Sequence, residues 1–194
     1  MLFVSLGVDC GTATILNSLG LRICSLPFDW VVSYEGITNI IKNDFANYLP
    51  EICDNTYEKL NKKCGVYFMH NTFPRDIEQI NHRVERFKNI LETCTEKIMF
   101  VRKSHGEHHH GEYNNITDDI DDAIKLDILF KEKYPHLNYE IHVILICGNC
   151  FMNQMNHEHI SSNIKIHNVA RPYPPNINPT NPDYFDEVCR NVFR

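Results

Sequence analysis

Short apolar runs alternate with segments of helical periodicity along this chain, and this alternation restricts its fold more than any other feature. A strand that is buried on both faces reads as a continuous apolar run, whereas an amphipathic helix repeats its apolar residues every three or four positions. Strands that alternate with helices predict a mostly parallel sheet covered on both faces. The apolar runs cover residues 2–6, 66–69, 97–102, 140–147 and 164–169, and helical spacing is found at 12–19, 37–48, 80–93, 117–134 and 184–193.

A single domain accounts for the whole length of 194 residues, because neither an internal repeat nor an interdomain linker stands out. We therefore expect one α/β domain over residues 1–194, with about five strands in a three-layer, Rossmann-like or flavodoxin-like arrangement. Residues 105–116, which are rich in His, Gly and Glu, predict a mobile loop. Residues 171–183, rich in Pro and Asn, predict a connection to a C-terminal helix.

The charge and composition exclude several classes of protein. The formal net charge is −6, and Lys and Arg form no cluster, so general nucleic-acid binding is not expected. No window approaches the roughly 18 uninterrupted apolar residues of a membrane span, and no basic segment opens a secretory signal. The eight cysteines are irregularly spaced, which favours reduced thiols over a disulfide framework. We expect a cytoplasmic protein that binds neither nucleic acid nor a membrane.

Cys10 lies where the first apolar run turns into the first helical segment. In a parallel sheet, ligands bind beyond the carboxyl ends of the strands. The positive end of a helix favours a thiolate over a thiol, so this position predicts a nucleophile at neutral pH. Backbone N–H groups of the same turn, at Gly7, Asp9, Cys10 and Gly11, are expected to donate to a developing oxyanion.

A nucleophilic cysteine needs a base and a group that orients the base. His70, at the end of the second apolar run, is the best-placed candidate base, and Asp29 or Asn71 could orient it. Both residues also have a purely structural interpretation, Cys10 as a small buried side chain and His70 as a hydrogen-bonded structural histidine.

Other side chains could bind a substrate. Arg83 and Arg86 follow His70 on a helical segment and could orient a carboxylate or phosphate, or form ordinary surface ion pairs. Trp30 could line a ligand pocket or anchor a loop to the core.

Three blocks near the start, Ser5–Cys10, Leu19–Arg22 and Ser25–Trp30, resemble the beginning of a papain-like cysteine peptidase domain family of bacteria, plants and large DNA viruses. The most specific block is Pro-Phe-Asp-Trp, and the resemblance continues more loosely through residues 68–71, 83–87 and 98–102. The resemblance implies a Cys-His site at Cys10 and His70, with Asp29 as a third member.

The sequence departs from this family in one position and from papain in its layout. Family members favour an acidic residue after the histidine, where this chain has Asn71. A strand that leads directly into the nucleophile is closer to a flavodoxin-like or lipase-like layout than to papain. An esterase-like or acyltransferase activity therefore stays open.

Two hypotheses of function follow. In the first, the protein is a cysteine hydrolase or acyltransferase that attacks an amide or ester of a peptide or acyl substrate and forms a thioester on Cys10. This chemistry requires neither a metal nor an organic cofactor. In the second, the protein is a non-catalytic α/β binding module that holds a polar ligand or a partner segment in the same cleft.

Three further motifs could suggest metal binding, but each has a simpler interpretation. Cys147-x-x-Cys150, followed by His157 and His159, is expected to end a buried strand. The tract of His105, His108, His109 and His110 is expected to be a solvated loop. The acidic run 118–122 lacks the ligand pattern of a calcium site and is expected to be a solvated helix N-terminus.

Overall fold

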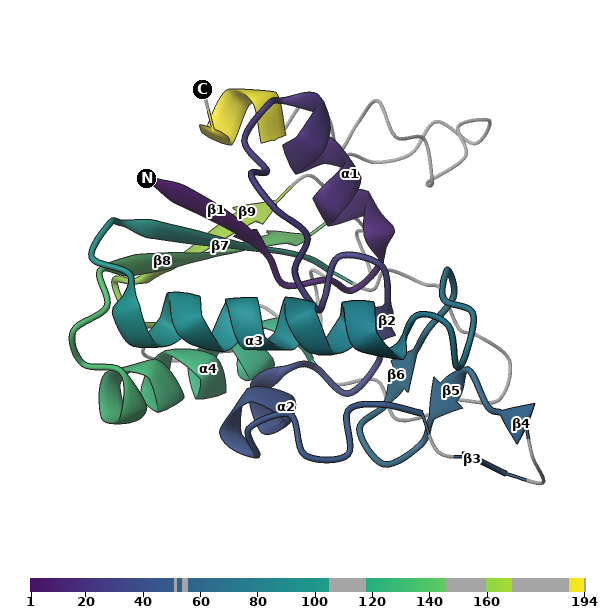
Figure 1. The fold of residues 1–194 in the computed structure, drawn as a ribbon. Helices are drawn as coiled ribbons and strands as arrows, with labels where there is room; N and C mark the ends of the chain where they lie inside the picture. Colours follow the sequence, from purple (N-terminus) through teal and green to yellow (C-terminus); the bar gives the residue numbers. More distant parts are fainter. Residues whose placement is uncertain (51, 54–55, 105–117, 146–159, 169–188, 194) are drawn as a thin grey trace.

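The fold is built on a parallel sheet of four strands. The computed structural model describes residues 1–50, 52–53, 56–104, 118–145, 160–168 and 189–193. The strands lie in the order β1-β7-β8-β9, and each pairs in parallel with its neighbour (Figure 1). They are β1 (Leu2–Ser5), β7 (Ile98–Lys103), β8 (Tyr139–Leu145) and β9 (Ile164–Asn168).

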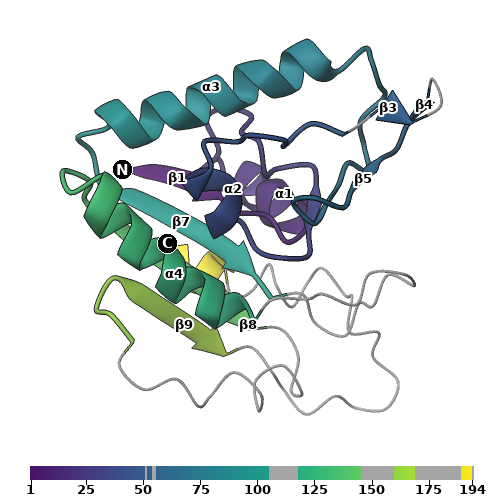
Figure 2. The ribbon, with the colours of Figure 1, turned by 90° about the horizontal axis from the view of Figure 1, so that it is seen from below.

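Helices cover both faces of this sheet, so the predicted three-layer α/β fold is confirmed. Three helices lie on one face, and α4 packs against β8 and β9 there (Figures 1 and 2). The opposite face carries α1 and the short helix 189–193 (Figure 1). The helices of the first face are α2 (Thr38–Lys42), α3 (Ile77–Thr93) and α4 (Asp119–Lys133); α1 covers Cys10–Ser18.

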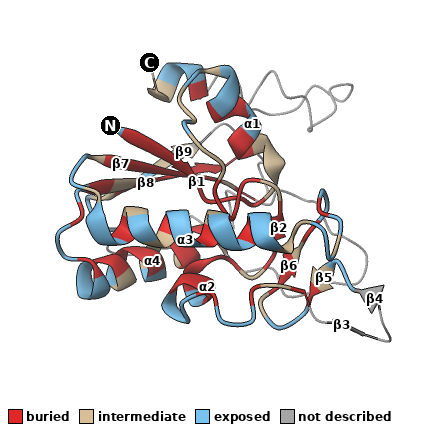
Figure 3. Ribbon diagram, viewed as in Figure 1, coloured by how far each residue is buried: buried red, intermediate tan, exposed pale blue. Residues whose placement is uncertain are grey.

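The alternation of side chains along the strands divides the interior into two cores. Val4 and Phe100 face α3 and α4, whereas Phe3 and Val101 face α1. Nearly all the residues of β1, β7 and β8 are buried (Figure 3), as expected for parallel strands between two helical layers, whereas the edge strand β9 is more exposed. Each fully buried aliphatic or aromatic side chain contributes about 1.5–3 kcal/mol.

The apolar run 66–69 does not join the parallel sheet. Its first two residues form β6 (Val66–Tyr67), which pairs antiparallel with β2 (Val32–Ser33) and β5 (Leu60–Asn61). The reason is local: a tight turn ending at Gly65, with a φ of 62°, joins β5 to β6, and such a turn joins only antiparallel strands. A further short hairpin pairs β3 (Ile52–Cys53) with β4 (Thr56–Tyr57).

The helix predicted over 37–48 is shorter than its apolar spacing suggests. It ends at Lys42, and Asp44, Phe45 and Asn47 then take positive φ angles. The aromatic residues beyond it are buried all the same, because Phe45 stacks against Phe28 with ring centroids 5.7 Å apart.

Several expectations lie outside the described residues. These are the mobile loop 105–116, the connection 171–183 and most of the helix predicted over 184–193. None of the helices in the described ranges is long and apolar enough to cross a membrane.

Candidate functional site

The site begins at the turn that follows β1. Gly7 and Val8 both have positive φ angles, 73° and 56°. Such a conformation is easy for glycine but strained for a β-branched residue such as valine. Two hydrogen bonds hold it: the Val8 carbonyl accepts from the Ser33 N–H at 3.1 Å, and the Gly7 carbonyl accepts from the Thr12 hydroxyl at 3.1 Å.

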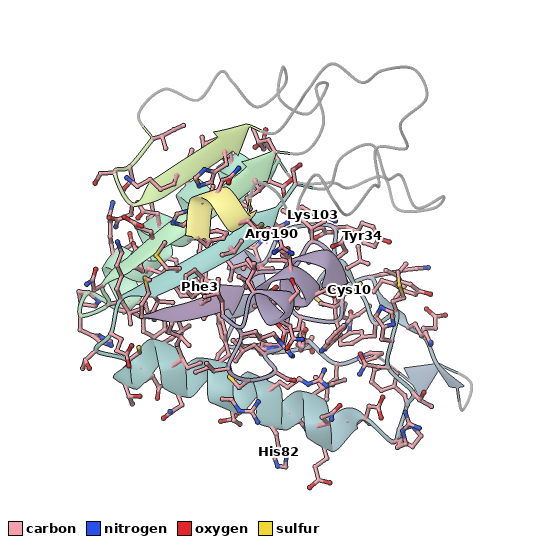
Figure 4. The ribbon with its side chains drawn as sticks, turned by 90° about the horizontal axis from the view of Figure 1, so that it is seen from above. Phe3, Cys10, Tyr34, His82, Lys103 and Arg190 are labelled. Atoms are coloured by element: carbon pink, nitrogen blue, oxygen red, sulfur yellow. The ribbon has the colours of Figure 1, made fainter. Side chains whose placement is uncertain are left out.

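The turn delivers Cys10 as the first residue of α1, as the sequence predicts. Asp9 is the N-cap, and its carboxylate accepts the Gly11 N–H at 2.8 Å. Lys103, the last residue of β7, forms an ion pair with Asp9 from the neighbouring strand. Cys10 and Lys103 therefore lie at the same end of the molecule, beyond the carboxyl ends of β1 and β7 (Figure 4).

The electrostatic environment of Cys10 differs from the one expected at a helix N-terminus. Burial and the neighbouring Asp9 carboxylate raise the pKa of the Cys10 thiol, and the ammonium of Lys103 only partly offsets them. The pKa of the thiol is therefore shifted in the direction opposite to the one expected at a helix N-terminus, because burial and the N-cap carboxylate outweigh the groups that lower it.

Two of the four backbone donors predicted for the oxyanion, those of Gly7 and Gly11, already have acceptors. The N–H of Gly11 donates to Asp9, and that of Gly7 donates to the Ser5 hydroxyl at 3.3 Å. An oxyanion can reach the Gly11 N–H only after the Asp9 carboxylate moves away.

His70 lies elsewhere than expected, because β6 belongs to the small antiparallel sheet. Its side chain is exposed, and its ring meets that of Trp30 edge to face with centroids 6.0 Å apart. No hydrogen bond joins His70 to Cys10 within the described part of the chain. Cys10 opens α1 after a strand of the parallel sheet, whereas His70 lies in a turn just after β6 of the antiparallel sheet.

Asp29 does not orient His70 in this structure. One of its carboxylate oxygens accepts from Arg22 Nε and Nη2, at 3.0 and 2.7 Å, and from the Leu26 N–H at 2.8 Å. The side chain is buried, and burial raises the pKa of this carboxyl against the opposing effects of these partners. Asp29 therefore closes the loop between α1 and β2.

Trp30, rather than Asp29, connects this loop to His70. The guanidinium of Arg22 lies 5.5 Å from the centre of the Trp30 ring, and the His70 ring meets Trp30 edge to face. The guanidinium of Arg22, which also pairs with Asp29, and the imidazole of His70 thus both contact the indole of Trp30.

The remaining predicted binding residues differ in their surroundings. Asn71 is buried, and its side-chain oxygen has no hydrogen-bond partner among the described residues. Arg83 is partly buried and donates from Nη2 to Gln79 at 2.6 Å, while its buried Nε has no partner in the described part of the chain. Arg86 donates to the backbone carbonyl of Ser25, which gives it a structural partner.

The sequence interpretation missed the charged end of β7. Arg102 is buried and forms an ion pair with Asp119 at 2.7 Å, and the next residue, Lys103, contacts the Cys10 turn. Asp119 and Asp122 are buried as well, so the expectation that the acidic run 118–122 is solvated is wrong. Two cations directly after a buried apolar run were the available signal, because a charge there needs a partner.

Two of the three motifs considered for metal binding lie outside the described residues. Among the described residues, no group of three or more His, Cys, Asp and Glu side chains could hold a metal ion. The Cys147-x-x-Cys150 motif, His157, His159 and the histidine tract 105–110 lie outside the described residues. Among the described residues, Cys10, Cys24, Cys64 and Cys94 are free thiols.

Comparison with known proteins confirms the family resemblance over the first part of the chain. Residues 1–55 match the family described as "Putative papain-like cysteine peptidase (DUF1796)". An uncharacterised protein of Acanthamoeba polyphaga mimivirus is 53% identical over 49 residues, which are 24% of this chain and 22% of that protein. The chain thus matches less than a quarter of the length of this relative. No solved structure matches.

Proposed function

We propose that this protein is a cysteine hydrolase or acyltransferase that forms a thioester on Cys10 with an amide or ester substrate. One observation carries the proposal: Cys10 follows a strained turn at the carboxyl end of β1 and opens α1. Strained backbone is concentrated at functional sites, and this edge of a parallel sheet is where ligands bind. The family matched by residues 1–55 supports the same nucleophile.

The raised pKa of Cys10 selects a mechanism in which the thiol loses its proton during attack. In the proposed reaction, His70 accepts this proton as the sulfur attacks the substrate carbonyl carbon. The tetrahedral intermediate then expels the amine or alcohol, which takes the proton from His70, and a thioester remains. Water or another acceptor then gives up a proton to His70 and attacks the thioester carbonyl carbon. The C–S bond breaks, the acyl group leaves on the acceptor, and the sulfur takes the proton from His70 to restore the thiol.

Substrate binding would have to bring His70 toward Cys10, because the two make no hydrogen bond in this structure. His70 is exposed on the short antiparallel sheet and contacts Trp30 through its ring alone, which supports such an approach. Catalytic hydrogen bonds are often formed only in the substrate complex. We propose Trp30 as a wall of the substrate site beside His70.

The ion pair between Asp9 and Lys103 would allow the capping carboxylate to leave the N-terminus of α1. In this proposal, the oxyanion displaces the Asp9 carboxylate from the Gly11 N–H, and Lys103 retains the displaced carboxylate. The N–H groups of Cys10 and Gly11 would then stabilise the oxyanion.

Substrate specificity is proposed to involve Arg83 and Asn71. Each has a buried side-chain atom without a partner, Nε of Arg83 and the side-chain oxygen of Asn71. A buried donor and acceptor of this kind suit a polar group of the substrate. Arg86 would orient a carboxylate or phosphate of the substrate only if that group displaced the Ser25 carbonyl from its guanidinium.

Mass spectrometry after incubation with p-nitrophenyl acetate tests the proposal. We expect acetylation of Cys10 and faster release of p-nitrophenol than with Cys10→Ala, whereas Cys94→Ala serves as the matched control and keeps the wild-type rate. His70→Ala should lower acetylation of Cys10 by about 10²–10⁴-fold, the usual contribution of a general base. Acetylation of Cys94 and Cys10 at equal rates would overturn the proposed function. Since the reaction needs a reduced thiol, we expect it to occur in a reducing compartment such as the cytoplasm.

A non-catalytic binding module is the second candidate. The observation that favours it is the closed helix N-terminus, where the Asp9 carboxylate occupies the Gly11 N–H and raises the pKa of Cys10. In that case Cys10→Ala would bind a ligand as well as the wild type does, and Cys10 would not be acylated.

A further inference from the structure

The buried end of β7 holds the backbone that presents Cys10. Nη1 of Arg102 donates to the Leu6 carbonyl at 3.0 Å and approaches the Ser33 hydroxyl at 3.3 Å. Leu6 directly precedes the turn at Gly7 and Val8, and Ser33 holds Val8 through its own N–H. The guanidinium thus contacts both segments that support the turn.

Asp119, at the start of α4, orients this guanidinium. Its carboxylate accepts from Arg102 Nε at 2.7 Å, and both side chains are 1% exposed. The arrangement joins β1, β2, β7 and α4 at one buried point behind the turn.

A buried arginine at this position is costly for the fold. Nη2 of Arg102 is buried and has no hydrogen-bond partner among the described residues, which destabilises the fold. Replacement of a buried ion pair by apolar side chains of similar volume is often neutral or stabilising. Stability alone therefore does not account for Arg102, whereas control of the adjacent turn does.

We propose that Arg102 is a positioning residue for Cys10: its guanidinium, oriented by Asp119, holds the Leu6 carbonyl and thereby fixes the strained turn that presents the thiol. The inference rests on the proposed role of Cys10 as nucleophile. Without the clamp formed by Arg102 and Asp119, the turn relaxes, the thiol gains contact with solvent and its separation from Asp9 increases. Cys10 then behaves more like an ordinary exposed thiol.

Alkylation by iodoacetamide between about pH 6 and pH 10, followed by peptide mass spectrometry, tests this inference without any substrate. We compare the wild type with Arg102→Lys and with the double variant Arg102→Met and Asp119→Leu. The double variant removes the clamp and leaves no buried charge unpaired, so it is expected to fold. We expect alkylation of Cys10 at neutral pH to rise by roughly 3- to 10-fold in the double variant and by less in Arg102→Lys, which keeps the charge.

The controls separate positioning from loss of stability. Asp127→Asn alters a buried carboxylate of the same helix that pairs with Lys131 and Tyr139, and it should leave alkylation of Cys10 unchanged. Within each protein, Cys94 is the reference thiol, and Cys64, whose pKa burial raises to about 12, reports opening of the fold.

The results distinguish a positioning role of Arg102 from a general loss of stability. A faster reaction of Cys10, with Cys64 and Cys94 unchanged, supports the clamp. An unchanged Cys10 in the double variant overturns it, and so does an equal effect of Asp127→Asn. If p-nitrophenyl acetate fails to acylate wild-type Cys10, the proposed function fails, while the alkylation profile still decides the role of Arg102.

Discussion

At the scale of single residues, the turn after β1 depends on two backbone conformations that most side chains avoid. Gly7 also lies against its neighbours: a Cβ added there would be 3.1 Å from the Phe28 carbonyl oxygen and 3.3 Å from the Ser33 hydroxyl. Gly20 has almost the same φ, 69° against 73°, but a Cβ added there would have no neighbour within 4 Å. A comparison of Gly7 with Gly20 thus separates the effect of a positive φ on stability from the effect of close contacts.

Gly7→Ala should therefore destabilise the protein more than Gly20→Ala. The strain of the left-handed conformation is expected to cost about 1–2 kcal/mol at either position, and the contacts with Phe28 and Ser33 should add about 1 kcal/mol at Gly7 alone. Urea denaturation of the two variants measures the difference. Equal losses would show that the close approach at Gly7 has no energetic effect.

At the scale of elements, α2 is capped by a side chain from another helix. Its N-cap residue, Ile37, offers no side-chain acceptor, and the carboxylate of Asp122 on α4 accepts the N–H groups of Ile37 at 2.9 Å and Thr38 at 3.2 Å. The Thr38 hydroxyl donates to the Asp122 carbonyl at 2.9 Å in return. One buried aspartate therefore fixes the position of α2 against α4.

Asp122→Ala is expected to lower the free energy of unfolding by about 2–4 kcal/mol, because two buried N–H groups lose their acceptor. The neighbouring Asp121 is the matched control. It pairs with Lys125 at 2.5 Å on the exposed side of α4, so Asp121→Ala should cost less than about 0.5 kcal/mol. Equal effects in urea denaturation would contradict the role of Asp122 as a cap for α2.

At the scale of the whole molecule, a pair of histidines joins the sheet to the C-terminal helix. His142 on β8 and His167 on β9 share a hydrogen bond of 2.9 Å, and Phe193 packs against His142 with ring centroids 5.2 Å apart. Burial lowers the pKa of both imidazoles, and that of His167 falls to about 4. Glu140, which forms an ion pair with Lys97, also contacts Nε2 of His142 at 3.3 Å.

Stability is expected to fall as the pH drops from about 6.5 toward 4. The native state binds protons on His167 less readily than the unfolded chain does, so its contribution is fully present above the unfolded pKa of about 6.5 and is lost below it. The expected loss is about 1–2 kcal/mol, less than the full pKa difference implies, because the ring is partly exposed to solvent. Thermal unfolding across this range measures it, and His167→Asn should flatten the profile. A wild-type profile that matches that of His167→Asn would contradict this account.

The local patterns of the sequence were sufficient for the layers of the fold and for the turn at Cys10. Buried strands and amphipathic helices carry their periodicity in adjacent residues, and Asp9 caps α1 through a neighbour two positions away. The strand, turn and helix around Cys10 are local in the same sense, so they were predicted with nearly the right bounds.

Only the tertiary structure decided what surrounds Cys10. His70 was expected to end a strand of the parallel sheet, but the short turn at Gly65 places β6 in a separate antiparallel sheet. Asp29 pairs with Arg22, Arg102 pairs with Asp119, and Lys103 reaches Asp9 from a strand more than 90 positions away in the chain. Charged side chains choose partners by proximity in the folded chain and by burial, neither of which is encoded in the spacing of nearby residues. The sequence by itself determined the position of Cys10 between strand and helix, and the packing of distant strands and helices determined its electrostatic environment.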